Sequence, residues 1–193
     1  MKGNQSPKRR KVILFILLSI FLISVFVLSI SIDSEKLIDG IGIHNGYLIL
    51  FLVAFFAGFS AFTVLSFYGV LISFIGAGLN PVLIGIITGI SLTLGDLFMF
   101  YFGRNGRDLI TGKVDKSINK MSMYFSKKNR AKLIPYFAYI YISFLPLPND
   151  WLLLFLASLR YPQKKMNIII VLGDFSHACA LTFLTAKGIL FFD

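Results

Sequence analysis

The amino-acid sequence predicts an all-α integral membrane protein, in which spanning helices are combined with two re-entrant helical hairpins in an inverted-topology repeat. Three observations lead to this fold class. Hydrophobic residues make up 56% of the 193 residues, and charged residues only 15%. The charges gather between long uncharged runs, and two of these runs are interrupted by residues that break helices. Two similar segments also recur within the chain. This length and composition favour one membrane domain, residues 12–193, preceded by a short tail.

The N-terminal part of the chain predicts a basic cytoplasmic tail and an anchor helix. Residues 1–11 carry five basic side chains, and residues 12–32 contain no charge. Basic residues beside an apolar span are typical of the cytoplasmic side. A cleaved signal peptide is the alternative, but its apolar region would be shorter and followed by a small-residue cleavage site. We therefore expect a multi-pass protein of the cell (plasma) membrane with a cytoplasmic N-terminus.

Residues 47–78 predict the first re-entrant hairpin. These 32 residues carry no charge. One spanning helix needs only about 20 residues, and two spans with a loop would need more than this run offers. The run is interrupted near its middle by Gly58, Ser60, Thr63, Ser66 and Gly69. One long tilted helix is the alternative.

Residues 81–102 predict a spanning helix that begins at the Asn80-Pro81 turn. One face of this helix carries Gly85, Gly89, Asp96 and Gly103. Small residues at such spacing allow another helix backbone to approach closely. Asp96 is therefore expected to point at protein rather than lipid. It is a candidate proton- or substrate-binding residue, with a purely structural hydrogen bond as the alternative.

Residues 103–132 predict a basic cytoplasmic loop, and residues 134–160 predict the second re-entrant hairpin. The loop contains apolar residues at helical spacing, which indicates a short amphipathic helix on the inner leaflet; a plain solvated loop is the alternative. In the hairpin, Pro146 and Pro148 break the helix. Asn149 and Asp150 then fall in the first turn of the second half, near its positive dipole end, and are candidate site residues. We expect Trp151 to pack within the hairpin.

Residues 166–190 predict the last span, which carries Asp174 and His177. If the two halves pack face to face, Asp96, Asp150 and Asp174 come close together. Their joint ionisation would be unfavourable, so the group could hold an exchangeable proton. His177, one turn after Asp174, could share that proton, or be an ordinary interior histidine. The only cysteine, Cys179, excludes an intrachain disulfide, and its apolar surroundings predict a buried thiol.

The net charge of +10 points to membrane lipids rather than nucleic acid. The basic residues form three clusters beside apolar runs, at positions 2–11, 104–132 and 160–165. Arg104 and Arg160 are candidate ligands of inner-leaflet phosphates, together with Arg107, because a guanidinium matches the geometry of a phosphate. Snorkelling of these side chains is the alternative. We expect lipids with anionic head groups as partners and no nucleic acid, metal or cofactor; homo-oligomer formation is left open.

Two pairs of segments suggest an internal repeat. Residues 74–81 and 155–162 align at an offset of 81, and the pairs Gly95-Asp96 and Gly173-Asp174 at an offset of 78. Each segment follows a broken apolar run and precedes a full span. By the charge rule the first hairpin enters from outside and the second from inside. Inverted repeats of broken helices are the architecture of many transporters.

Gly95-Asp96, followed by Tyr101-Phe102-Gly103-Arg104-Asn105-Gly106, resembles the "GD…Y-x-GR-x-x-G" signature of the DedA family, also called the SNARE-associated or VTT-domain membrane proteins. The Pro-Leu-Pro-Asn-Asp and Leu-Arg-Tyr-Pro segments are similar to its short YqaA-like branch. The resemblance implies a lipid transporter that scrambles or flips phospholipids or polyprenyl-phosphate carriers, often linked to the proton gradient. It also implies Arg160 as the match to a family arginine. Many members carry a glutamate in the first hairpin, and residues 57–78 have none here.

Three functions remain as hypotheses. The first is a transporter of phospholipid or polyprenyl phosphate, which uses the aspartates to carry protons or to bind the head group. The second is a non-catalytic membrane protein for envelope assembly or homeostasis, which should tolerate Asp→Asn substitutions. The third is a membrane enzyme acting on lipid phosphates. The sequence contains no His–Arg phosphatase constellation and no Asp-x-x-Asp motif, so we do not expect an enzyme.

Overall fold

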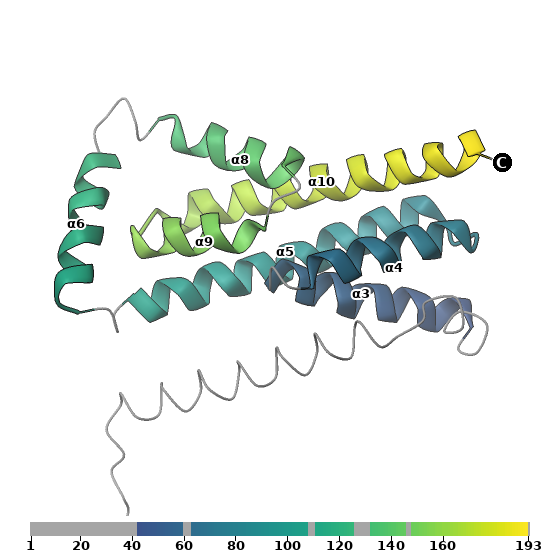
Figure 1. The fold of residues 1–193 in the computed structure, drawn as a ribbon, viewed down its shortest axis with the longest axis horizontal. Helices are drawn as coiled ribbons and strands as arrows, with labels where there is room; N and C mark the ends of the chain where they lie inside the picture. The colour runs from purple at the N-terminus through teal and green to yellow at the C-terminus, as the bar shows by residue number, and fades with distance from the viewer. Residues whose placement is uncertain (1–41, 60–62, 108–110, 126–131, 146–147, 193) are drawn as a thin grey trace, which may run out of the picture. The chain divides into compact units, whose positions relative to one another are not determined.

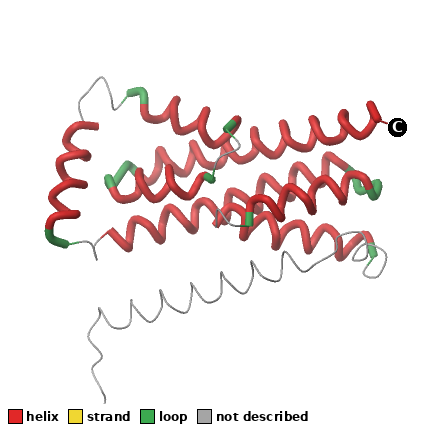
Figure 2. The backbone as a smooth tube through the Cα atoms, viewed as in Figure 1, coloured by secondary structure: helices red, strands yellow, loops and turns green. Residues whose placement is uncertain are grey.

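The computed structural model describes residues 42–59, 63–107, 111–125, 132–145 and 148–192. These residues form seven helices and no strand, all within one compact unit (Figure 1, Figure 2). The all-α prediction is confirmed for this part of the chain. The predicted tail, residues 1–11, and the predicted anchor, residues 12–32, lie outside the described residues.

The first three helices come from the uncharged run and the span that follows it. They are α3 (Ile43–Phe59), α4 (Val64–Gly76) and α5 (Pro81–Gly106). Helix α5 begins where predicted, because the Asn80 side chain accepts hydrogen bonds from the backbone amides of Val82, at 2.9 Å, and Leu83, at 3.4 Å. Since α3 and α4 are separate helices that pack against each other, the alternative of one long tilted helix is wrong.

The last three helices repeat this order of two short helices and one long one. They are α8 (Ile134–Phe144), α9 (Asn149–Ser158) and α10 (Gln163–Phe192). Between the two groups, α6 (Lys113–Phe125) occupies the basic loop, where the amphipathic pattern predicts a helix. Among the helices that the structure describes, α5 and α10 are long and apolar enough to cross a membrane, while α3, α4 and α8 are shorter apolar helices.

The same hydrogen-bonded turn ends α4 and α9. The amides of Gly78 and Leu79 donate to Ile75 and Phe74, and those of Arg160 and Tyr161 donate to Ala157 and Leu156. Both turns are Schellman motifs, with the left-handed residue Gly78 (φ 85°) in one and Arg160 (φ 57°) in the other. They match at an offset of 82, so the alignment at 81 is wrong by one residue. The error arises because Pro162 occupies the capping position of Asn80, not the position of Pro81.

Helices of the two groups pack against each other reciprocally. Each first short helix packs on the long helix of its own group, α3 on α5 and α8 on α10. Each second short helix packs on the long helix of the other group, α9 on α5 and α4 on α10. The long helices α5 and α10 pack side by side and run in opposite directions (Figure 1).

The buried apolar side chains form two clusters, one in each group. The first joins α3 and α4 to the N-terminal half of α5, around Phe67, Phe74 and Ile84. The second joins α8, α9 and the start of α10 to Phe100, near the other end of α5. Asp96 therefore lies on α5 between the parts of the helix that contact the two apolar clusters.

Two predictions about single side chains are wrong. Trp151 does not pack within the hairpin, because 75% of it is exposed. Cys179 is exposed and not a buried thiol. Both residues lie on apolar helices, where the sequence pattern alone does not distinguish an outward from an inward face.

Candidate functional site

Gly58 on α3 and Gly95 on α5 allow the backbones of these two helices to pack very closely. A Cβ on Gly95 would come within 2.3 Å of the Phe55 carbonyl oxygen, and a Cβ on Gly58 within 2.6 Å of the Leu92 carbonyl oxygen. The close backbone approach thus occurs at Gly95. At Gly85 and Gly89, where the small-residue pattern predicts it, the nearest atoms are side chains of α10. In the second group, Gly173 takes the corresponding place, with Ile142 of α8 against it.

Asp96 follows Gly95 and is completely buried, as the predicted protein-facing side of the helix implies. Its Oδ2 accepts a hydrogen bond of 3.0 Å from the Asn149 side-chain amide. Its Oδ1 has no hydrogen-bond partner among the described residues and faces Gly58, where a Cβ would lie 3.1 Å away. Within the part of the chain that the structure describes, one oxygen of this buried carboxyl group is therefore left without a hydrogen-bond donor.

Asp174 follows Gly173 and is also completely buried. Its carboxyl group lies near the carboxyl group of Asp96 and the Thr93 hydroxyl. Neither of its oxygens completes a hydrogen bond of good geometry within the described part of the chain. Counted along the chain from the left-handed residue of the preceding turn, Arg160 for Asp174 and Gly78 for Asp96, Asp174 comes four residues sooner than Asp96. Four residues are about one helical turn, so both aspartates keep the same face of their helices.

The start of α9 brings two more polar side chains to this pair. Asn149, the first residue of the helix, donates to Asp96, and Asp150 is buried beside it. The charge of Asp150 acts on Asp96 and on Tyr141. The Tyr141 hydroxyl also donates to the Pro148 carbonyl oxygen at 3.2 Å, which ties the end of α8 to the start of α9. The structure therefore brings together four of the predicted site residues: Asp96, Asn149, Asp150 and Asp174.

His177 lies next to this group but directs its ring toward both pairs of short helices. Its Nδ1 is 3.2 Å from the Ser143 carbonyl oxygen on α8, which makes Nδ1 the donor. Its Nε2 is 3.3 Å from the Tyr68 hydroxyl on α4 and accepts from it in the neutral ring. The sequence predicts that His177 could share a proton with Asp174, but the ring nitrogens of His177 contact Ser143 and Tyr68 instead. His177 instead connects the two groups of helices across α10.

The three arginines lie away from the aspartates, toward the far end of α5 and the α9–α10 turn. Arg107 does not snorkel: it is 5% exposed, and its Nε donates to the Ser158 carbonyl oxygen at 2.9 Å. Its Nη2 lies 2.5 Å from Asp115 and 2.9 Å from Asn119, both on α6. Arg104 is half-buried and donates from Nη1 to the Tyr161 carbonyl oxygen at 2.9 Å. Arg160 is exposed.

Several residues of the site carry no signal in the sequence analysis. Thr93 lies three residues before Asp96, and this helical spacing could have identified it. Tyr68 and Ser143 reach His177 only through the packing of α4 and α8, which no local pattern predicts. The sequence predicts Gly58 as a helix breaker, but its contact with α5 depends on the tertiary structure.

The chemistry available is that of an acidic, water-poor cluster. Two neighbouring carboxyl groups can share one proton, since like charges repel strongly away from water. Within the described residues, no group of three or more His, Cys, Asp or Glu side chains is arranged to hold a metal ion. No family model matches the chain, and neither a curated protein nor a solved structure shows significant similarity to it.

Proposed function

We propose that the chain is a multi-pass protein of the cell membrane that moves an anionic lipid, a phospholipid or a polyprenyl phosphate, with protons carried by Asp96 and Asp174. The observation that carries the proposal is that these two carboxyl groups are completely buried and lie near each other. Each comes from the long helix of a different group. Ionisable groups inside a membrane are rare and usually functional, because their burial costs several kcal/mol.

The reciprocal packing supports an inverted repeat. The long helices α5 and α10 run in opposite directions, and each is flanked by its own first short helix and the second short helix of the other group. In transporters with inverted repeats, the site lies where the repeats meet. Asp96 and Asp174 lie on the corresponding faces of α5 and α10, which supports a site between the two proposed repeats.

The lengths of the short helices support re-entrant hairpins. The helices α3, α4, α8 and α9 have 17, 13, 11 and 10 residues. At 1.5 Å per residue they span roughly 15–26 Å, less than the ~30 Å hydrocarbon core of a bilayer. The end of α3 and the start of α9 both contact α5 near Asp96. Both hairpins would then turn at mid-membrane depth, where irregular backbone must be enclosed by protein.

The choice of an anionic lipid as cargo has two supports. Residues 95–106 resemble the DedA signature, and the start of α10 carries exposed basic residues, Lys164 and Lys165. Basic residues at this end indicate the cytoplasmic side and attract anionic head groups. The DedA resemblance is part of the proposal, and so is the cytoplasmic N-terminus.

The test is lipid movement in proteoliposomes, measured with labelled phospholipid and labelled polyprenyl phosphate. Wild type is compared with Asp96→Asn and Asp174→Asn, with Lys116→Gln as the control because Lys116 is exposed on α6. We expect movement in wild type and the control and its loss in the two buried variants. Wild-type rates in folded Asp96→Asn and Asp174→Asn proteins would favour the non-catalytic role. A lipid recovered with a changed mass would favour the enzyme.

A further inference from the structure

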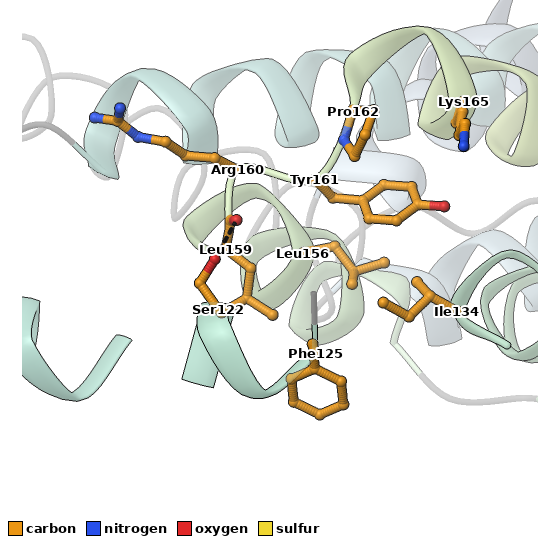
Figure 3. A pocket seen from close by; sticks show the side chains of 9 residues that line it. All are labelled: Ser122, Phe125, Ile134, Leu156, Leu159, Arg160, Tyr161, Pro162 and Lys165. Atoms are coloured by element: carbon orange, nitrogen blue, oxygen red, sulfur yellow. Dashed lines mark hydrogen bonds between the residues drawn. The ribbon is translucent and has the colours of Figure 1, made fainter. Parts of the chain in front are cut away.

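A cavity, separate from the aspartates, lies between the end of α6, the start of α8 and the turn that joins α9 to α10 (Figure 3). Its volume is about 240 Å³. Apolar side chains, including Phe125, Ile134 and Leu156, form part of its wall, and Tyr161 and Lys165 also line it. In Figure 3 the Tyr161 hydroxyl and the Lys165 ammonium lie on the same side, while the Arg160 guanidinium points away from the Tyr161 ring. One side of the cavity thus offers two hydrogen-bond donors, one of them cationic.

An apolar groove of about 460 Å³ continues from this cavity along α8 and α9. The two share Phe125, Ile134 and Leu156, and the groove extends over Phe137 and Leu152. Every residue that lines the groove is apolar, and its volume lies within the ~300–1,000 Å³ usual for ligand sites. Neither lining contains an acidic side chain among the described residues. Cavity and groove together form an amphiphilic surface whose polar end is cationic.

The backbone around the polar end is engaged by donors from elsewhere. Arg104 donates to the Tyr161 carbonyl oxygen, Arg107 donates to that of Ser158, and the Ser122 hydroxyl of α6 donates to that of Leu159 at 3.3 Å. These bonds occupy carbonyl oxygens that would otherwise repel an anion, and they stabilise the negative end of α9. Burial raises the pKa of the Tyr161 hydroxyl, so it remains a neutral donor.

We propose that this surface binds a membrane amphiphile with a phosphate head group: the phosphate contacts Lys165 and Tyr161, and the hydrocarbon chain lies in the groove between α8 and α9. This site adds a lipid-binding step to the proposed function. It rests on that function only in that its ligand comes from the bilayer. It would hold the lipid at the cytoplasmic side before the lipid reaches the aspartates. The combination of an apolar groove and a cationic end selects an amphiphile over free phosphate.

The test is native mass spectrometry of the full-length protein in a non-ionic detergent. The probe is dodecyl phosphate, compared with dodecylphosphocholine, which has the same chain and no net charge, and with inorganic phosphate, which has no chain. We expect retention of dodecyl phosphate in preference to both comparators. Lys165→Gln should weaken retention roughly fivefold, the upper end for loss of one exposed charge pair. Lys164→Gln, next to it but outside the lining, should leave retention unchanged.

Equal losses in Lys164→Gln and Lys165→Gln would overturn the proposal in favour of general charge attraction. Retention of inorganic phosphate as strong as that of dodecyl phosphate would also overturn it, as would unchanged retention in Ile134→Trp, which fills the junction of cavity and groove. Asp174→Asn separates the two proposals, because it should retain the probe and lose lipid movement. If wild type moves lipid but does not retain dodecyl phosphate, the binding site alone would be refuted.

Discussion

The Asn149 side-chain amide donates a hydrogen bond of 3.0 Å to Oδ2 of Asp96, so that the first residue of α9 is joined to the middle of α5. This bond crosses between the two groups of helices. This bond holds the Asp96 carboxyl group, since its other oxygen has no hydrogen-bond partner among the described residues. The position of α9 thus depends on a contact with the Asp96 carboxyl group.

Replacing Asn149 by alanine should therefore both destabilise the protein and impair its function. Loss of a buried hydrogen bond of this kind costs about 1–3 kcal/mol. We expect a lower unfolding temperature in detergent and slower lipid movement. Asn105→Ala, an exposed amide on the same helix as Asp96, is the control and should change stability by no more than about 0.5 kcal/mol. Identical behaviour of the two variants would contradict the role of the Asn149 bond.

Substitution of Gly95 by alanine should destabilise the protein strongly. The added Cβ would meet the backbone oxygen of Phe55 at 2.3 Å, and a backbone cannot move aside easily. Overpacking costs typically about 1–3 kcal/mol, and we expect the upper part of this range. Gly173→Ala should cost less, because its neighbour is the Ile142 side chain. Gly69→Ala is the control: nothing lies within 4 Å, and alanine favours the helix. Thermal unfolding that ranks the three differently would show that α3 is not packed as described.

Arg107 should hold α6 in place. Arg107→Met keeps an apolar stem but removes the donors to Ser158, Asp115 and Asn119. We expect faster amide hydrogen exchange throughout residues 113–125, with little change in α10. Lys116→Met, an exposed substitution on the same helix, should leave the exchange unchanged. Additive effects of Arg107→Met and Asp115→Asn on unfolding would argue against the pair, because interacting residues are non-additive.

Trp151 gives a direct measure of hairpin depth. It is the only tryptophan of the chain, it lies in the first turn of α9, and 75% of it is exposed. If the hairpin is re-entrant, lipids brominated near the end of the acyl chain should quench its fluorescence more than lipids brominated near the head group. Tyr124→Trp in a Trp151→Phe background places the probe on α6 and should reverse the order. Strong quenching of Trp151 by a water-soluble quencher would place the start of α9 outside the bilayer.

The sequence predicts much of the helix arrangement, because breaks and starts are local. Asn80-Pro81 caps α5 directly, and the polar residues between Gly58 and Gly69 mark the separation of α3 from α4. The Gly-Asp pairs also give two of the site residues. In each pair the glycine admits the first short helix of its own group, and the aspartate that follows faces the interior.

Features that depend on packing are not predictable in this way. The use of Arg104 and Arg107 as anchors of the α9–α10 turn requires carbonyl oxygens more than fifty residues away. His177 bonds to Tyr68 and Ser143 for the same reason. The exposure of Trp151 and Cys179 depends on which face of the helix packs against a neighbour. An apolar helix has similar hydropathy on its packed and its exposed face. Lipid movement, the DedA resemblance and the absence of enzymatic activity stay predictions.

Proton flux during lipid movement tests the role of the carboxyl pair most directly. Proteoliposomes containing a pH-sensitive dye would receive the transported lipid without an imposed gradient, and the dye would report protons that cross with it. We predict a change of internal pH that begins with the addition of lipid in wild type and is absent in folded Asp174→Asn protein. The same change of internal pH in Asp174→Asn would contradict the account.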